Sequence, residues 1–219
     1  MKNALPSGVI FDWDNTLVDS WAAIAEAINY VRGKYGLTLW DRRFIQQHCT
    51  RSARESFPEW FGDLWQDAWD DYYTYFDKVR SQMGITEAYG ATPLLAWLKE
   101  KAIPSVVVSN KSGHYLRLEA EQMGWKDYFE ALVGAHDAPY DKPHRAHADQ
   151  ALLSAGLEGG PDIWFVGDTE ADVACARNAA CTPVLVGADE EAKRLLVSLS
   201  FRDCEAVLDE LKRREAGVP

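Results

Sequence analysis

The sequence predicts an α/β fold: a doubly wound, Rossmann-like parallel sheet core that carries an inserted all-α domain. Two observations lead to this prediction. Short apolar runs alternate with helical patterns from about residue 90 onward, and such alternation is typical of parallel sheets with helices on both faces. In contrast, residues 19–83 show helical periodicity and no convincing strand.

The expected core elements follow one another in a regular order. Residues 8–13 are the first expected strand, because Val9, Ile10 and Phe11 suit a buried, pleated interior. Further strands are expected at residues 104–109, 131–135, 162–167 and 183–187. Helices are expected at residues 91–101, 112–123, 144–156, 169–180, 189–198 and 203–214. After residue 104, each expected strand is joined to the next by a helix, as parallel strands require.

The insert divides the chain into two expected domains. The core comprises residues 1–18 and 84–219, and residues 19–83 form the second domain. Within the insert, apolar residues recur at spacings of three and four: Phe61, Trp65, Ala68, Trp69, Tyr72, Phe76 and Val79. This spacing is typical of the buried face of an amphipathic helix. A chain of 219 residues is long enough for one good core and a small second domain.

Composition narrows the class of protein. The chain is 47% hydrophobic and 26% charged, and its formal net charge is −11. That charge disfavours nucleic acid or an anionic membrane as a general partner. Its four cysteines form no CxxC pair, and neither a signal-peptide pattern nor a membrane-length apolar stretch is seen. We therefore expect a cytoplasmic protein that is a monomer or a homodimer.

The most informative residues follow the first expected strand. Asp12 and Asp14 stand two apart at its carboxyl end, and Thr16 follows them. Open α/β sheets bind ligands at the carboxyl ends of their strands. A buried cluster of carboxylates is costly unless a cation or a proton neutralises it. These aspartates therefore indicate metal chemistry more than a structural role.

Polar residues stand at matching places elsewhere in the core. Ser109 and Asn110 end the strand near 104–109, Lys142 lies in a polar loop, and Asp168 and Asp172 follow the strand near 162–167. Each residue alone has an ordinary interpretation: Ser109 as a helix N-cap, Lys142 as a solvated loop residue, and the two aspartates as helix-start acids. Lys111 could also face a cleft there, and no role is assigned to it.

These four segments, VIFDWDNTLVDS, SVVVSNK, the Lys142 loop and IWFVGDTEAD, resemble in order the four motifs of the haloacid dehalogenase-like (HAD) superfamily. The resemblance is strongest to the phosphoglycolate phosphatase-like members, and it covers nearly the whole chain. It implies that the insert is a helical cap of the C1 type. Asn15 stands where that family usually has Gly, and Asn tolerates the positive φ that such a turn needs.

The resemblance implies a Mg²⁺-dependent phosphatase that acts on a small phosphorylated metabolite through an aspartyl-phosphate. Asp12 would be the nucleophile, and Asp14 the general acid and base. Thr16, Ser109, Asn110 and Lys142 would bind the substrate phosphate. The metal ligands would be the Asp12 carboxylate, the Asp14 backbone carbonyl and Asp168, with Asp172 binding through water or supporting the ligands. The charge count agrees, since four aspartates and a phosphate dianion need a cation beyond Lys142.

Two alternatives stay open at this stage. A β-phosphoglucomutase-like phosphotransferase keeps both Asp12 and Asp14, and a non-enzymatic homologue could bind a phosphorylated ligand or a protein. Asp14 itself argues against dehalogenases and phosphonatases that resemble this chain, because they replace the acid there. We expect residues 46–57 to take part in substrate selection. Arg51 and Arg54 in this stretch could bind an anionic group such as a carboxylate. Ordinary surface arginines are an equal interpretation.

Overall fold

The computed structural model describes residues 4–187 and 189–217 of the chain. These residues form two units: one contains the chain up to Val18 and from Glu87 onward, and the other contains Asp19–Thr86. The chain passes between the units through two short paired strands, β2 (Val18–Asp19) and β3 (Thr86–Glu87). The predicted boundary after residue 83 coincides with the end of a helix at Met83.

The first unit is built on a six-stranded sheet in which all neighbouring strands are parallel. The strand order is β5-β4-β1-β6-β7-β8, which confirms the predicted α/β fold class. The strands are β1 (Gly8–Phe11), β4 (Ser105–Ser112), β5 (Ala131–Ala135), β6 (Ile163–Gly167), β7 (Thr182–Val186) and β8 (Leu199–Phe201). Strand β8 is not predicted from the sequence, because a three-residue edge strand is too short to show an alternating pattern.

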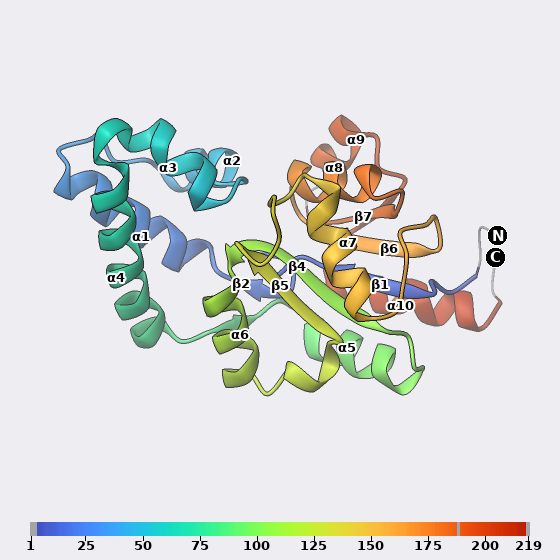
Figure 1. The fold of residues 1–219 in the computed structure, drawn as a ribbon. Coiled ribbons are helices and arrows are strands. Elements are labelled where there is room, and N and C mark those ends of the chain that lie inside the picture. The colour runs from blue at the N-terminus through green and yellow to red at the C-terminus, as the bar shows by residue number, and fades with distance from the viewer. Residues whose placement is uncertain (1–3, 188, 218–219) are drawn as a thin grey trace. The chain divides into compact units, whose positions relative to one another are not determined.

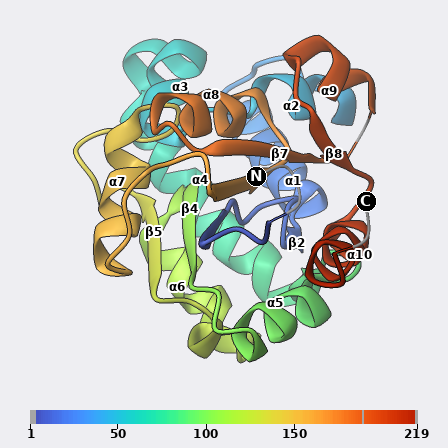
Figure 2. The ribbon, with the colours of Figure 1, turned by 90° about the vertical axis from the view of Figure 1, so that its right-hand side faces the viewer.

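Helices cover both faces of this sheet (Figures 1 and 2). One face carries α7 (Arg145–Ser154), α8 (Glu170–Asn178) and α9 (Asp189–Leu195), and the other carries α5 (Ala91–Glu100), α6 (Gly113–Gln122) and α10 (Cys204–Glu215). A short 3₁₀ helix, Lys126–Tyr128, precedes β5. Across residues 4–187 and 189–217, no helix reaches the length and hydropathy of a membrane-spanning segment.

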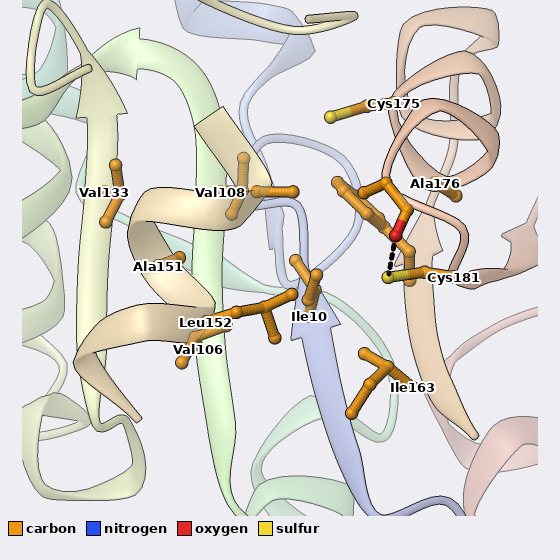
Figure 3. Close-up of a cluster of buried hydrophobic side chains, with 13 residues drawn as sticks. Ile10, Val106, Val108, Val133, Ala151, Leu152, Ile163, Cys175, Ala176 and Cys181 are labelled. Atoms are coloured by element: carbon orange, nitrogen blue, oxygen red, sulfur yellow. Dashed lines mark hydrogen bonds between the residues drawn. The ribbon is translucent and has the colours of Figure 1, made fainter. Parts of the chain in front are cut away.

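The face covered by α7 and α8 holds a continuous apolar core (Figure 3). Alternate residues along each strand point into it: Ile10 from β1, Val106 and Val108 from β4, and Ile163 and Phe165 from β6. Their intervening neighbours are also buried, because helices cover both faces of the sheet. The strands are therefore held from both sides, and their carboxyl ends form a fixed edge.

The second unit is all-helical. It contains α1 (Trp21–Lys34), α2 (Arg42–His48), α3 (Ala53–Phe61), the 3₁₀ helix Gly62–Leu64 and α4 (Trp65–Met83). The predicted amphipathic face is right for α4, where Ala68, Tyr72, Phe76 and Val79 are buried. It is wrong for Phe61, which ends α3 instead. Gly62 follows it with a φ of 55°, a conformation that stops the helix and suits glycine.

Candidate active site

Four charged side chains from three separate segments converge at the carboxyl end of the sheet. Asp12 follows β1, Asp168 follows β6, Asp172 lies in the first turn of α8, and Lys142 lies in the loop before α7. Lys142 Nζ lies 2.5 Å from Asp12 Oδ1 and 2.7 Å from Asp172 Oδ1. Carboxylate oxygens of the three aspartates lie within 4.8 Å of one another. These four of the sequence-predicted residues therefore meet in one cluster.

Pairing with β6 fixes the backbone of Asp12. Its backbone N–H donates to the Val166 carbonyl of β6 at 2.9 Å. The predicted tolerance of Asn15 for the turn is confirmed, since its φ is 64°. The Thr16 hydroxyl donates to Asp168 Oδ1 at 3.3 Å, so Thr16 links the first turn to the fourth motif. Its predicted contact with phosphate stays a prediction.

Asp172 is held by its own helix. Its Oδ2 accepts hydrogen bonds from the backbone N–H and the hydroxyl of Thr169, at 2.9 and 2.6 Å. This pair forms a capping box at the start of α8. Gly167 allows the close approach, because a Cβ there would lie 2.4 Å from Asp172 Cβ. Both Asp172 oxygens are thus hydrogen-bonded, one to Thr169 and one to Lys142. This arrangement fits the predicted role in which Asp172 supports the metal ligands and does not bind the ion directly.

The loop that carries Lys142 is fixed by Asn110. The Asn110 side chain accepts from the Lys142 backbone N–H at 2.9 Å and donates to the Lys142 carbonyl at 3.2 Å. The Lys142–Pro143 peptide bond is cis. Ser109 is buried, and its Oγ accepts from the Lys111 backbone N–H at 3.2 Å. Ser109 belongs to β4 and the cap of α6 is Ser112, so the N-cap interpretation of Ser109 is wrong.

A second charged cluster surrounds Asp14. Lys111 Nζ lies 2.6 Å from Asp14 Oδ1 and 3.1 Å from Glu119 Oε2. The Trp13 indole N–H donates to the same Glu119 oxygen at 2.7 Å. Sequence reasoning gave no role to Lys111 and did not single out Glu119. The sequence feature that could have indicated a role for Lys111 is its position directly after Ser109 and Asn110, near the end of β4.

Burial sets the protonation of these groups. It raises the pKa of Asp12, as does Asp172, and despite the opposing effect of Lys142 that pKa reaches about 7. Burial, then Asp12 and Asp172, also raise the pKa of Asp168 well above its usual range. Burial would lower the pKa of Lys142, but the two carboxylates that it contacts raise it overall. Lys142 therefore stays charged, and its single positive charge does not balance the three aspartates around it.

The described residues fit a magnesium ion. Three aspartates and Lys142 carry formal charges of −3 and +1, which leaves −2, the charge that one divalent cation balances. Ligand oxygens on opposite sides of Mg²⁺ are about 4 Å apart, close to the separation of at most 4.8 Å found here. Asp12 and Asp168 would bind the ion directly, and Asp172 would hold Lys142 and the helix start.

The two arginines predicted to select the substrate, Arg51 and Arg54, belong to the helical unit. Arg51 forms an ion pair with Glu59 at 2.5 Å and its side chain is 43% exposed. Arg54 lies in the first turn of α3, after the N-cap residue Ser52. Their role in substrate selection stays a prediction.

A buried acid cluster with one lysine lies at the carboxyl edge of a doubly wound sheet, and its carboxylates are close enough together to hold a metal ion. The chain matches the model of the haloacid dehalogenase-like hydrolase family over residues 9–186. The phosphoglycolate phosphatase of Chromobacterium violaceum is 31% identical over 190 residues, which cover 82% of this chain and 84% of that protein. The phosphoglycolate phosphatase of Yersinia pestis is 29% identical, with 80% and 78% covered.

Solved structures agree with this likeness. A HAD-superfamily hydrolase from Ehrlichia chaffeensis has a TM-score of 0.68 at 25% identity, covering 97% of this chain and 98% of its own. A predicted phosphatase from Clostridium acetobutylicum has a TM-score of 0.82 at 23% identity, covering 96% and 100%, and shows the likeness of fold. This chain belongs to the haloacid dehalogenase-like hydrolase family. The predicted family and enzyme class are confirmed.

We expect Gly167→Ala to destabilise the protein, because the new methyl group would overlap Asp172, which Thr169 and Lys142 hold in place. Overpacking of this kind costs roughly 1–3 kcal/mol. Urea unfolding measures the change. Gly33→Ala in α1 is the matched control, since its nearest atom lies at an ordinary 3.6 Å. A Gly167→Ala protein as stable as the wild type would contradict the close packing of α8 on β6.

Mg²⁺ should stabilise the protein more at about pH 8 than at about pH 6. The folded-state pKa of Asp12, about 7, and that of Asp168 are raised. The metal-free fold therefore binds extra protons and loses stability as pH rises toward 7. Below that pH the metal must displace those protons, which weakens its binding. Thermal unfolding with and without Mg²⁺ measures the shift, and Asp168→Asn should abolish it. An equal shift at both pH values would contradict this electrostatic account.

Proposed function

We propose that this protein is a Mg²⁺-dependent phosphatase that hydrolyses a small phosphorylated metabolite, with 2-phosphoglycolate as the first candidate. The observation that carries the proposal is the convergence of Asp12, Asp168 and Lys142 at the carboxyl end of β1 and β6. Family membership supports a hydrolase. The relatives named phosphoglycolate phosphatase support the substrate class.

In the first half of the proposed reaction, Asp12 attacks the phosphorus atom and the bond to the leaving oxygen breaks. A carboxylate nucleophile divides a very slow hydrolysis into two easier steps. Lys142, 2.5 Å from Asp12 Oδ1, orients the carboxylate and offsets charge on the transferring phosphoryl group. Asp14 gives its proton to the leaving oxygen, so that the product departs as a neutral alcohol.

In the second half, Asp14 takes a proton from a water molecule, which attacks phosphorus and releases phosphate and free Asp12. Asp14 therefore ends the cycle protonated, as it began. Asn110 supports both halves by fixing the backbone of Lys142. When bound by Asp12 and Asp168, Mg²⁺ would supply the positive charge that lets a phosphate dianion enter this acidic site.

Asp12→Asn should abolish phosphatase activity, and Asp14→Asn should lower kcat by about 10²–10⁴-fold, the usual contribution of general acid–base catalysis. Both variants should still fold, because each substitution removes a charge and keeps the shape of the side chain. The measurement is Mg²⁺-dependent phosphate release from 2-phosphoglycolate and a panel of phosphorylated metabolites. Asp149→Asn, on the exposed part of α7, is the control. Wild-type protein that releases no phosphate from any panel member would refute the proposal.

If the cap arginines select an acidic substrate, Arg51→Ala or Arg54→Ala should raise KM for 2-phosphoglycolate more than KM for p-nitrophenyl phosphate. The physical reason is that a guanidinium group pairs with the carboxylate that only the first substrate carries. Steady-state kinetics with both substrates measures the difference. Arg42→Ala, at the start of α2, is a control within the same unit. Equal changes in KM for the two substrates would exclude this role.

A further inference from the structure

The ammonium group of Lys111 joins the carboxylates of Asp14 and Glu119 beside the proposed reaction centre. We propose that Lys111, anchored by Glu119, is a positioning residue that orients Asp14 toward the leaving oxygen of the substrate. The inference rests on the proposed function, in which Asp14 is the acid of the first step. It gives a role to Lys111, the last residue of the segment SVVVSNK, and adds Glu119, which lies outside the four motif segments.

The burial of the three side chains has the order that a positioning role requires. The Lys111 side chain is 5% exposed and that of Glu119 is 3% exposed, whereas that of Asp14 is 19% exposed. Asp14 is thus held from its buried side through Oδ1, and it keeps an open side toward solvent. A lysine ammonium on a flexible stem positions a partner only when its own place is fixed.

Glu119 and Trp13 fix that place. Glu119 Oε2 accepts from both Lys111 Nζ, at 3.1 Å, and the Trp13 indole N–H, at 2.7 Å. The Trp13 ring is fully buried and packs edge-on against Trp125 and Phe129. A buried carboxylate without partners would be strongly unfavourable, so Glu119 retains the lysine. Because Trp13 directly precedes Asp14, the same network also holds the backbone next to the acid.

The two proposed reacting aspartates therefore have separate lysines. Lys142 bridges Asp12 and Asp172, and Lys111 bridges Asp14 and Glu119. The contact of 2.6 Å between Lys111 Nζ and Asp14 Oδ1 restrains the proposed acid. Lys111 therefore keeps Asp14 from turning toward Lys142, where it would compete with the nucleophile. This separation is what a site with one nucleophile and one acid needs.

The test exploits a difference between leaving groups. Phenyl phosphate and p-nitrophenyl phosphate have similar shapes, but phenolate leaves poorly without a proton and nitrophenolate leaves readily. We expect Lys111→Met to lower kcat/KM for phenyl phosphate about 10–100-fold, part of the usual range for general acid catalysis. For p-nitrophenyl phosphate, kcat/KM should change less than about threefold, because nitrophenolate leaves readily without a proton. The comparison uses kcat/KM because it reports the steps up to departure of the leaving group.

Three further variants complete the test. Lys111→Arg keeps the charge and should retain more phenyl phosphate activity than Lys111→Met. Glu119→Gln keeps the shape of the side chain that anchors Lys111. It should also lower kcat/KM more for phenyl phosphate than for p-nitrophenyl phosphate, but by a smaller factor than Lys111→Met. This variant keeps the inference testable if Lys111→Met does not fold. Lys126→Met removes an exposed lysine paired with Glu121 and should change neither ratio.

Two outcomes would overturn the inference: equal losses of kcat/KM for both substrates in Lys111→Met and Glu119→Gln, which is what a merely structural role produces, or no loss for either. In both outcomes wild-type protein still hydrolyses the two esters. If wild-type protein hydrolyses neither ester nor any metabolite phosphate, the proposed function has failed instead. The inference about Lys111 then falls with it.

Discussion

The structure depends on one electrostatic constraint: three aspartates are brought together at one sheet edge around a single ammonium group. Asp12, Asp168 and Asp172 carry three negative charges, and Lys142 returns one positive charge. Burial, and to a smaller extent repulsion from Asp172, raises the pKa of Asp12 to about 7 despite the opposing effect of Lys142, so that protonation offsets part of the negative charge. A divalent ion bound at this edge would balance the same shortage of positive charge.

The scaffold sustains this arrangement through contacts that do no chemistry themselves. A sheet buried on both faces fixes the ends of β1, β4 and β6, and helix α8 brings its capping box against Gly167. Asn110 holds the backbone of Lys142, and Glu119 holds the ammonium of Lys111. Each lysine therefore has a supporting partner on β4 or α6. Sites built on rigid elements keep their charged groups within the short distances that proton and phosphoryl transfer require.

Much of this could be predicted from sequence, for physical reasons. The long apolar strands carry a strong pattern, and Asp12, Asp168 and Lys142 meet because parallel strands end at a common edge. Strand β8 was missed because three residues carry too little pattern, and Phe61 was misplaced because helical spacing continues across Gly62. The Lys111–Glu119–Trp13 network depends on side-chain directions across two elements, which spacing alone does not encode. The Asn110 clamp on a loop 32 residues away is of the same kind.

In the proposed function, the acidic carboxyl edge of the sheet makes Asp12 a nucleophile. The most direct measurement quenches the enzyme during turnover with Mg²⁺ and substrate, and then treats it with borohydride, which reduces an aspartyl-phosphate to homoserine. Peptide mapping by mass spectrometry then locates the modified residue. The account predicts homoserine at position 12 and at no other aspartate. Homoserine at another position, or none while phosphate release continues, would contradict it.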